Sequence, residues 1–179
     1  RDCIPGCVPM FLVESADAGT GKGLYCDVTG IITTGRELPK MCNPSDVEET
    51  RKAITSCLMA GDSTIVLDNI RGTLGNAAID KALTDTIWQD RILGGNQMGK
   101  WPIKIVLYAT GNNPTIGGDT FRRIVRIRME ADCENPSERT EFKYPRLKQY
   151  VRTNRLQFVV DAITILTAYI VAGRPKDEL

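Results

Sequence analysis

The stretch VPMFLVESADAGTGKGLYCDVTGII, residues 8–32, decides the fold. Residues 8–13 are almost entirely apolar, which is typical of a strand that is buried on both faces. A loop with three glycines follows at residues 16–23, and apolar side chains then recur at helical spacing up to Gly35. The stretch therefore predicts a strand, a glycine-rich loop and a helix in direct succession.

The glycine-rich loop has the composition of a phosphate cradle. In such a cradle, backbone N–H groups at a helix start surround a polyphosphate, small residues let it approach, and a lysine such as Lys22 adds a positive charge. Compared with the GxxxxGK[ST] pattern, Ala16 replaces the first glycine, and Gly23 replaces the Ser or Thr whose hydroxyl binds Mg²⁺. The alternative is an ordinary glycine turn with an incidental lysine. The predicted nucleotide-binding residues are Ala18, Gly19, Thr20, Gly21, Lys22, Gly23 and Leu24.

Composition excludes several kinds of chemistry. The chain has 179 residues with 23 Lys and Arg, 22 Asp and Glu and no His, so its formal net charge is +1. Without His there is no Ser-His-Asp or Cys-His catalytic machinery, no His metal ligand and no imidazole base. The balanced charge gives no global argument for nucleic acid, a membrane or an acidic partner. Any such partner has to be inferred from local features.

The cysteines and the two ends bear on the compartment. Six cysteines are present and none forms a CxxC pair, which favours free thiols in a reducing cytoplasm over a zinc cage. The chain starts at Arg1 without a signal-peptide pattern, so we expect the start to lie inside a larger protein. The retention signal spelled by residues 176–179 is then interpreted as a coincidence at a truncation point.

The longest apolar run, residues 158–171, is interrupted by polar residues. It is shorter than the roughly 20 residues that a membrane span needs. We expect it to form a helix packed in the core, and we expect no membrane partner.

Strands and helices alternate along most of the chain. This order predicts an α/β domain with a mainly parallel central sheet over residues 1–130, followed by a linker and a helical lid fragment over residues 131–179. The expected strands are 38–41, 64–67, 105–109 and a half-exposed edge strand 125–129; the expected helices are 45–60 with a Ser45–Glu48 capping box, 77–86, a short one through Arg123 capped by Asp119, 147–154 and 156–173.

The buried strand 64–67 ends in Asp68 and Asn69. In P-loop NTPases an acidic residue at such a strand end holds Mg²⁺, and we predict that Asp68 does so through water, with Asn69 beside the attacking water. An amide orients water but accepts no proton. Hydrolysis is then either slow or dependent on another base, such as Asp90 or Glu14. The alternative for Asp68 is an ordinary turn residue.

Two further features carry a resemblance to a family. Ala109-Thr110-Gly111-Asn112-Asn113 closes an apolar strand, and Asp119-Thr120-Phe121-Arg122-Arg123 follows shortly after it. The arrangement resembles an AAA+ ATPase, and stretches from the P-loop to residue 175 are similar to ATPase modules of phage and mobile-element primase-helicases. The resemblance implies a three-layer P-loop NTPase fold, with Asn112 as the sensor and either Arg122 or Arg123 as an arginine finger in a neighbouring subunit. Asn113 is then a turn residue, and two solvated arginines are the alternative for that pair.

The resemblance also implies a role for the segment 87–103. Two candidate strands there are joined by Gly94-Gly95-Asn96-Gln97-Met98-Gly99, which indicates a hairpin inserted before the sensor strand. In related ring helicases such a hairpin contacts DNA, and Arg91, Lys100 and Trp101 are the candidate contacts. The alternative is a surface hairpin whose Trp88 and Trp101 pack in the core.

These inferences together predict an ATP-binding and ATP-hydrolysing motor module that acts on DNA. The expected cofactors are ATP and Mg²⁺, and the expected assembly is a homo-oligomeric ring. Because Gly23 and Asn69 depart from the usual pattern, the alternative is a nucleotide-binding switch or scaffold with weak or no hydrolysis. A small-molecule kinase is disfavoured, because we see no arginine-rich lid and no acceptor site in the sequence.

Overall fold

The computed structural model describes residues 6–42, 46–92, 94–133 and 135–175. It divides into two compact units: the first holds the described residues up to Gly23 together with Leu38–Arg139, and the second holds Leu24–Glu37 and the described residues from Thr140 onward. The grouping of Leu24–Glu37 with the C-terminal helices was not predicted. Ser45, Cys3 and the signal-like residues 176–179 lie outside the described residues.

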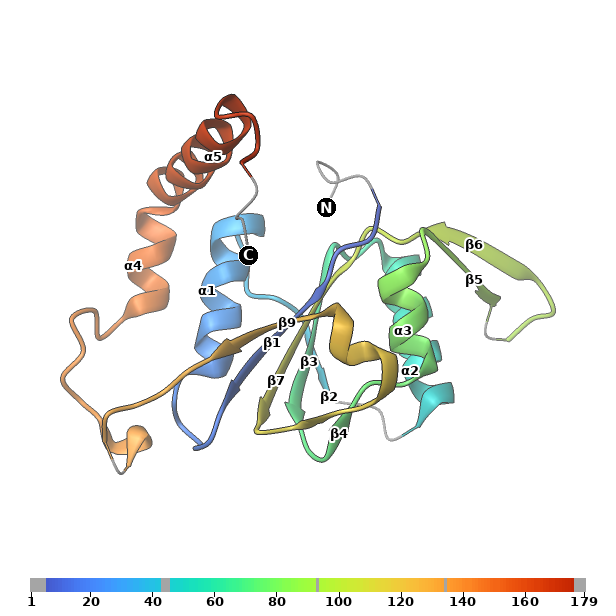
Figure 1. Cartoon of the computed structure of the whole chain (residues 1–179), viewed down its shortest axis with the longest axis horizontal. Coiled ribbons are helices and arrows are strands. Elements are labelled where there is room, and N and C mark those ends of the chain that lie inside the picture. The colour runs from blue at the N-terminus through green and yellow to red at the C-terminus, as the bar shows by residue number, and fades with distance from the viewer. Residues whose placement is uncertain (1–5, 43–45, 93, 134, 176–179) are drawn as a thin grey trace. The chain divides into compact units, whose positions relative to one another are not determined.

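A five-stranded sheet in the order β2-β3-β7-β1-β9 forms the centre of the first unit (Figure 1). All four neighbouring pairs are parallel, which confirms the mainly parallel sheet. The edge position of β9 also confirms the predicted half-exposed edge strand. The strands of this sheet are β1 (Met10–Ser15), β2 (Lys40–Cys42), β3 (Thr64–Ile70), β7 (Val106–Asn112) and β9 (Ile124–Arg128).

Two short strand pairs accompany this sheet. β4 (Thr73–Leu74) runs parallel to β8 (Thr115–Ile116), and β5 (Ile87–Arg91) runs antiparallel to β6 (Met98–Pro102). The β5–β6 pair stands out from the rest of this unit in Figure 1.

Helices α2 (Val47–Ala60) and α3 (Ala77–Thr84) pack on one face of the sheet (Figure 1). The Asp46 carboxylate caps α2 by accepting from the Glu49 N–H at 2.8 Å, so the cap lies one residue beyond the predicted Ser45. The core on this face combines apolar residues of both helices with Met10, Leu12, Ile65, Leu67, Leu107 and Ala109 of the sheet. Two short 3₁₀ helices complete the unit, η1 (Gly118–Arg123) and η2 (Pro136–Glu138).

The second unit contains most of α1 (Lys22–Thr34), with α4 (Leu147–Thr153) and α5 (Arg155–Val171). Ion pairs connect the segment after α1 to α4: Lys148 and Arg152 both bind the Glu37 carboxylate. These hydrogen bonds, the one from Lys148 first, lower the pKa of Glu37. These ion pairs join segments of the unit that lie more than 100 residues apart in the sequence.

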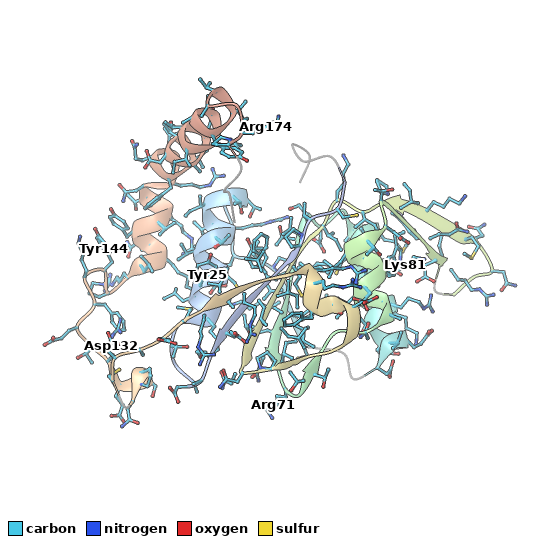
Figure 2. All side chains as sticks on the ribbon, viewed as in Figure 1. Tyr25, Arg71, Lys81, Asp132, Tyr144 and Arg174 are labelled. Atoms are coloured by element: carbon cyan, nitrogen blue, oxygen red, sulfur yellow. The ribbon has the colours of Figure 1, made fainter. Side chains whose placement is uncertain are left out.

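The prediction that residues 158–171 form a core-packed helix is wrong for the described residues. The helix α5 forms, but none of its side chains is buried, and Leu156 and Val171 are 78% and 81% exposed. Figure 2 shows side chains standing out along this helix. Its apolar composition does produce a helix, but most of its apolar side chains stay exposed; Phe158, which lies edge-on to Tyr150 of α4, and Val159 are half-buried.

The described helices were also compared with the dimensions of a membrane span. No single one is long and apolar enough to cross a membrane; α4 and α5, which bend by 75° between them, meet the length and composition criteria only when taken together.

The described cysteines carry no disulfide. Burial, followed by the nearby Asp62 carboxylate, raises the pKa of the Cys57 thiol to about 11. This thiol is therefore protonated at neutral pH, whereas reactivity requires the thiolate. Cys57 acts as a packing residue between α2 and the core.

Candidate functional site

The glycine-rich loop joins β1 to α1 in a tight turn. Gly19 and Gly21 have φ values of +76° and +95°, in the left-handed region that favours glycine. A Cβ atom on Gly19 would also lie 2.8 Å from the Cβ of Ser137 in η2. Side chains at these positions would strain the backbone or collide with a neighbouring segment, so the local geometry explains the glycines that the sequence shows here.

The side chain of Lys22 folds back over this loop. Its Nζ donates to the hydroxyl of Ser15, to the backbone oxygen of Asp17 at 2.9 Å and to the Thr20 hydroxyl at 3.1 Å. Burial lowers the pKa of the amine, and the Asp17 carboxylate partly opposes that shift. The ammonium group is therefore held by oxygen acceptors, which are also the groups that a phosphate presents.

The start of α1 adds donors at the same place. The first four N–H groups of a helix have no partner within the helix, and they carry the positive end of its dipole. Lys22, Gly23 and Leu24 form this first turn, which holds no acidic side chain. A loop and a helix start of this kind suit an anion.

The register of the sheet brings two of the predicted residues, Asp68 and Asn112, to the edge at which β1 ends. Strand β7 lies between β3 and β1, and Asn112 at its end pairs with Ser15 at the end of β1. Asp68 follows Leu67, which pairs with Ala109 of β7. Carboxyl ends of parallel strands meet at the same edge of a sheet. β7, the strand that ends in Asn112, thus lies directly beside β1, the strand before the loop.

Asp68 and Asn69 lie in an irregularity of β3. The Thr110 hydroxyl of β7 donates to Asp68 Oδ1 at 2.6 Å and accepts from the Asn69 N–H at 2.9 Å. Asn69 has a φ of +56°, and its side chain is exposed. One hydroxyl thus holds both residues of the predicted metal and water site.

The two asparagines at the end of β7 differ. Asn112 is exposed, and its side chain makes no hydrogen bond within the described part of the chain. Asn113 has a φ of +44°, and its N–H donates to the backbone oxygen of Ser15 at 3.1 Å. These features confirm Asn113 as a turn residue and leave Asn112 as the side chain available to a ligand.

Neither Glu14 nor Asp90, the two alternative bases for the attacking water, is placed for that role. Glu14 pairs with Gly111, one position along from the pair of Val13 and Thr110. Successive side chains of a strand point to opposite faces, so Glu14 faces away from Thr110 and the Asp68 that it binds. The other candidate, Asp90, lies in a separate polar network described below. Both carboxylates that were the alternative to slow hydrolysis are thus engaged with arginines elsewhere.

Glu14 has its own partner on the opposite face of the sheet. Its Oε1 accepts from Nε and NH2 of Arg126 on β9, at 2.8 and 2.6 Å, although Glu14 is 1% exposed. A buried carboxylate needs such a partner because its desolvation is costly. The pair satisfies Oε1 of this buried acid, while Oε2 has no hydrogen-bond partner among the described residues.

The paired arginines occupy different environments. Arg122 is 72% exposed and binds Asp119 at 2.6 Å within η1. Arg123 is 26% exposed, donates to the backbone oxygen of Asp119 at 2.8 Å and lies 3.5 Å from the carboxylate of Asp80 on α3. Asp119 makes no capping bond, since Gly117 precedes η1, so its predicted capping role is wrong. Arg122 is the more accessible of the two.

The hairpin separates its three candidate contacts. Arg91 pairs with Met98, and Lys100 pairs with Gln89. All four side chains are exposed. Trp101 lies across from the buried Trp88, packs against the core and covers Gly99 with its ring. Arg91 and Lys100 therefore share the exposed face, and Trp101 belongs to the covered one. This agrees with the alternative reading for both tryptophans.

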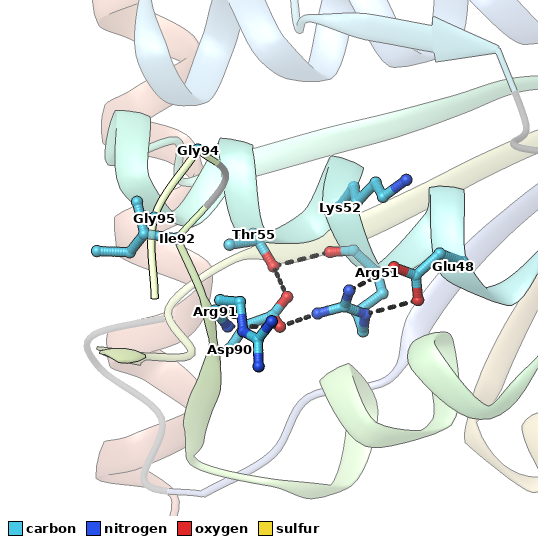
Figure 3. A pocket seen from close by; sticks show the side chains of 9 residues that line it. All are labelled: Glu48, Arg51, Lys52, Thr55, Asp90, Arg91, Ile92, Gly94 and Gly95. Atoms are coloured by element: carbon cyan, nitrogen blue, oxygen red, sulfur yellow. Dashed lines mark hydrogen bonds and ion pairs between the residues drawn. The ribbon is translucent and has the colours of Figure 1, made fainter. Parts of the chain in front are cut away.

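A polar network anchors the hairpin to α2 (Figure 3). Asp90 accepts from the Arg51 guanidinium and from the Thr55 hydroxyl, which in turn accepts from the Trp88 indole at 2.9 Å. Arg51 also binds Glu48 at 2.6 Å. Glu48, Arg51, Thr55 and Asp90 border a cavity of about 350 Å³ beside the turn of the hairpin, together with Lys52, Arg91, Ile92, Gly94 and Gly95. Arg51 thus pairs with carboxylates of both α2 and β5, so the network links the hairpin to α2.

Asp90→Asn is expected to lower the free energy of unfolding by about 2 kcal/mol, because hydrogen bonds to charged groups contribute about that much and Arg51 loses its buried acceptor. The measurement is the midpoint of denaturant unfolding at unchanged slope. Glu49→Gln is the matched control, since its pair with Lys52 is exposed and exposed ion pairs contribute little to stability. Equal losses in the two variants would contradict the anchoring role.

The donor set at the sheet edge fits magnesium in one respect. Mg²⁺ is usually held by one or two carboxylates together with substrate phosphates and water. Asp68 is half-buried and offers a second carboxylate oxygen, since the bond from Thr110 engages Oδ1. No cluster of three His, Cys, Asp or Glu side chains occurs among the described residues. The residues present thus suit a metal that arrives with a nucleotide.

No protein-family model and no curated protein sequence matches this chain. Among solved structures, the apo A form of the NrS-1 C-terminal region aligns with a TM-score of 0.56 at 14% identity, over 84% of this chain and 34% of that one. The two share a fold. A second structure of that region, residues 305–718, gives 0.50 with the same identity and coverage. A JCV helicase with a bound small molecule gives 0.41 at 11% identity, over 84% of this chain and 43% of that one. The chain spans about a third of the NrS-1 chain.

Sequence reasoning missed two groups of this site. Ser15 is the residue whose hydroxyl receives Lys22, and Thr110 is the residue that holds Asp68. Ser15 lies two residues after the apolar run of residues 8–13, and no pattern in the sequence marks its hydroxyl. Thr110 lies two residues before Asn112, and the polar residue inside an otherwise buried strand was the signal that could have marked it.

Proposed function

We propose that this chain is an ATP-binding and ATP-hydrolysing module of a motor that acts on DNA. The observation that carries the proposal is the sheet register, which brings the end of β1, Asp68 and Asn112 to one edge, where Lys22 lies over the glycine-rich loop. The resemblance to AAA+ ATPases and the fold shared with the NrS-1 C-terminal region support it.

Each residue of the site has a role in this proposal. Backbone N–H groups of residues 18–24 bind the phosphates, and Lys22 exchanges its oxygen partners in the loop for phosphate oxygens. Asp68 holds Mg²⁺ through water, and the metal neutralises charge on the phosphates. Asn112 contacts the γ-phosphate or orients the attacking water. Catalysis then rests on positioning and electrostatics, for which no imidazole is needed.

The proposal includes a ring in which one subunit completes the site of the next. Arg122 is the better candidate for this role, because its side chain is exposed and its partner Asp119 is also on the surface. Releasing a surface pair costs under about 1 kcal/mol. Arg123 is engaged with Asp80 on α3, so we assign it to the support of η1.

For the DNA contact we propose the exposed face of the β5–β6 hairpin. Arg91 and Lys100 carry positive charge there, which suits phosphate groups of a nucleic acid backbone. Trp101 is not part of this proposed contact, because its ring packs over Gly99. The network around Asp90 holds the hairpin to α2.

The second candidate, a nucleotide-dependent switch with weak or no hydrolysis, is favoured by one specific observation. Asn69 stands where a catalytic carboxylate is expected, and Glu14 and Asp90 are both engaged with arginines elsewhere. In a switch the same loop binds nucleotide, but turnover stays slow.

One experiment separates the two candidates. The protein that carries this chain, at its full length, is assayed for ATP binding and for Mg²⁺-dependent turnover with and without single-stranded DNA. We expect binding, and turnover that DNA stimulates severalfold. Binding with no DNA-stimulated turnover would favour the switch over the motor. Absence of nucleotide binding would reject both.

A further inference from the structure

Thr110 occupies a position that the roles proposed above do not use. It lies inside strand β7, is 3% exposed, and pairs in register with Val13 of β1. A buried hydroxyl has one hydrogen to donate and two lone pairs that accept. Thr110 uses both functions toward β3, donating to Asp68 and accepting from Asn69.

The register between β3 and β7 explains how one side chain reaches two residues. Leu67 pairs with Ala109 and Ile70 pairs with Gly111, so β3 advances three residues where β7 advances two. The extra residue is a β-bulge, a feature that re-aims side chains and often occurs beside active sites. Asp68 and Asn69 form the bulge, and the Thr110 hydroxyl binds both of them.

Asn69 carries the conformational cost of this bulge. Its φ of +56° lies in the left-handed region, which is uncommon for residues other than glycine, although asparagine adopts it more readily than most. Such conformations persist where the surroundings enforce them. The bond from the Asn69 N–H to Thr110 at 2.9 Å is one such constraint.

We propose that Thr110 is a positioning residue for the metal-side carboxylate, an inference that rests on the proposed function. Its bond to Oδ1 of Asp68 is a short charge-assisted hydrogen bond, which fixes the rotation of the carboxylate and directs Oδ2 to the metal-bound water. Through the Asn69 N–H it also holds the bulge that sets the place of the neighbouring amide side chain.

The test compares Thr110→Val, which removes the hydroxyl at nearly constant shape, with Thr110→Ser, which keeps it. The probe is a fluorescent ATP analogue titrated with and without Mg²⁺, so no turnover is needed. Loss of an outer partner of a metal ligand typically costs 10- to 100-fold in metal affinity. In Thr110→Val we expect the Mg²⁺ concentration for half-maximal effect to rise about tenfold or more, with metal-free nucleotide affinity unchanged. Thr110→Ser is expected to behave as the unaltered protein.

Two further measurements separate positioning from folding. Thr55→Val removes a comparable buried Thr–Asp hydrogen bond in the hairpin network, and it should lower stability without changing the Mg²⁺ dependence. Amide hydrogen exchange in the peptide that contains Asn69 should accelerate in Thr110→Val but not in Thr55→Val. If Thr110→Val does not fold, Thr110→Cys, whose S–H is a weak donor, takes its place with an intermediate loss expected.

The outcomes distinguish this proposal from the proposed function. If the unaltered protein binds the analogue with Mg²⁺ dependence and Thr110→Val retains it, the positioning role is overturned and the function stands. Equal losses in Thr110→Val and Thr110→Ser, or in Thr110→Val and Thr55→Val, also overturn it. If the unaltered protein does not bind the analogue, the proposed function fails and the role of Thr110 fails with it.

Discussion

Arg122→Ala is expected to reduce ATP turnover in the assembled oligomer by about 10³-fold or more, with little change in nucleotide affinity. An arginine that enters a neighbouring site stabilises charge that develops on the transferred phosphoryl group, and its effect on turnover lies in the range of 10³ to 10⁵. The Arg122 side chain is 72% exposed on η1 and binds a surface carboxylate, so it is free to reach another subunit. The measurement is steady-state turnover at saturating Mg²⁺ and ATP.

Mixing subunits tests whether Arg122 acts on a neighbouring site. In a mixed ring of Arg122→Ala and Lys22→Ala subunits, some interfaces combine an intact loop from the first with an intact arginine from the second. Activity should therefore return on mixing two inactive proteins. Absence of recovery in an oligomer that stays assembled on size-exclusion chromatography would contradict the role in trans.

Arg123→Ala is the comparison for Arg122→Ala, because the two arginines lie in different environments. Because Arg123 faces Asp80 and the backbone of η1, its loss should lower the free energy of unfolding and act within its own subunit. If Arg123→Ala instead shows the large turnover loss and the recovery on mixing, the trans role moves to Arg123.

Lys22→Ala is expected to weaken ATP binding by one to two orders of magnitude. Hydrogen bonds to charged groups contribute about 1.5 to 3 kcal/mol, and Lys22 presents an ammonium group over the loop that receives the phosphates. The measurement is equilibrium titration with ATP in the presence of Mg²⁺. Lys52→Ala removes the same charge from an exposed pair on α2 and should leave the affinity unchanged. Equal affinity in Lys22→Ala and the unaltered protein would show that the loop does not bind nucleotide.

The pH dependence of binding follows from the environment of Lys22. Burial lowers the pKa of its amine below the ordinary 10.5, so in the free protein the proton is lost earlier as pH rises than from an exposed lysine. A bound phosphate favours the charged form and raises the pKa again. ATP affinity should therefore fall at alkaline pH, with proton uptake on binding, and this fall should be absent in Lys22→Ala.

Features that depend on consecutive residues were predictable. The strand, loop and helix around residues 8–34 follow from an apolar run, clustered glycines and helical periodicity, all of which act over a few residues. The edge strand β9 follows from alternating polar and apolar residues. The observed cap of α2, Asp46, lies one residue after the predicted cap, Ser45. The two are adjacent, and both residue types are good helix caps.

Features that depend on pairing between distant segments were not predictable from such patterns. Asp90 was considered as a base, yet it binds Arg51 of α2, 39 residues away. Glu14 was considered for the same role, yet it binds Arg126, 112 residues away. The residue type predicts that a buried carboxylate needs a partner. It does not predict which partner the packing provides.

The sequence by itself determined that the chain contains a strand, a phosphate-type loop with Lys22 and a helix, because glycine content and hydrophobic period act locally. Only the tertiary structure decided that Thr110 holds Asp68, that Arg122 is more exposed than Arg123, and that most apolar side chains of α5 are exposed. These outcomes depend on strand register and on which faces meet. Both are set by long-range packing, which cannot be predicted from any single stretch of sequence.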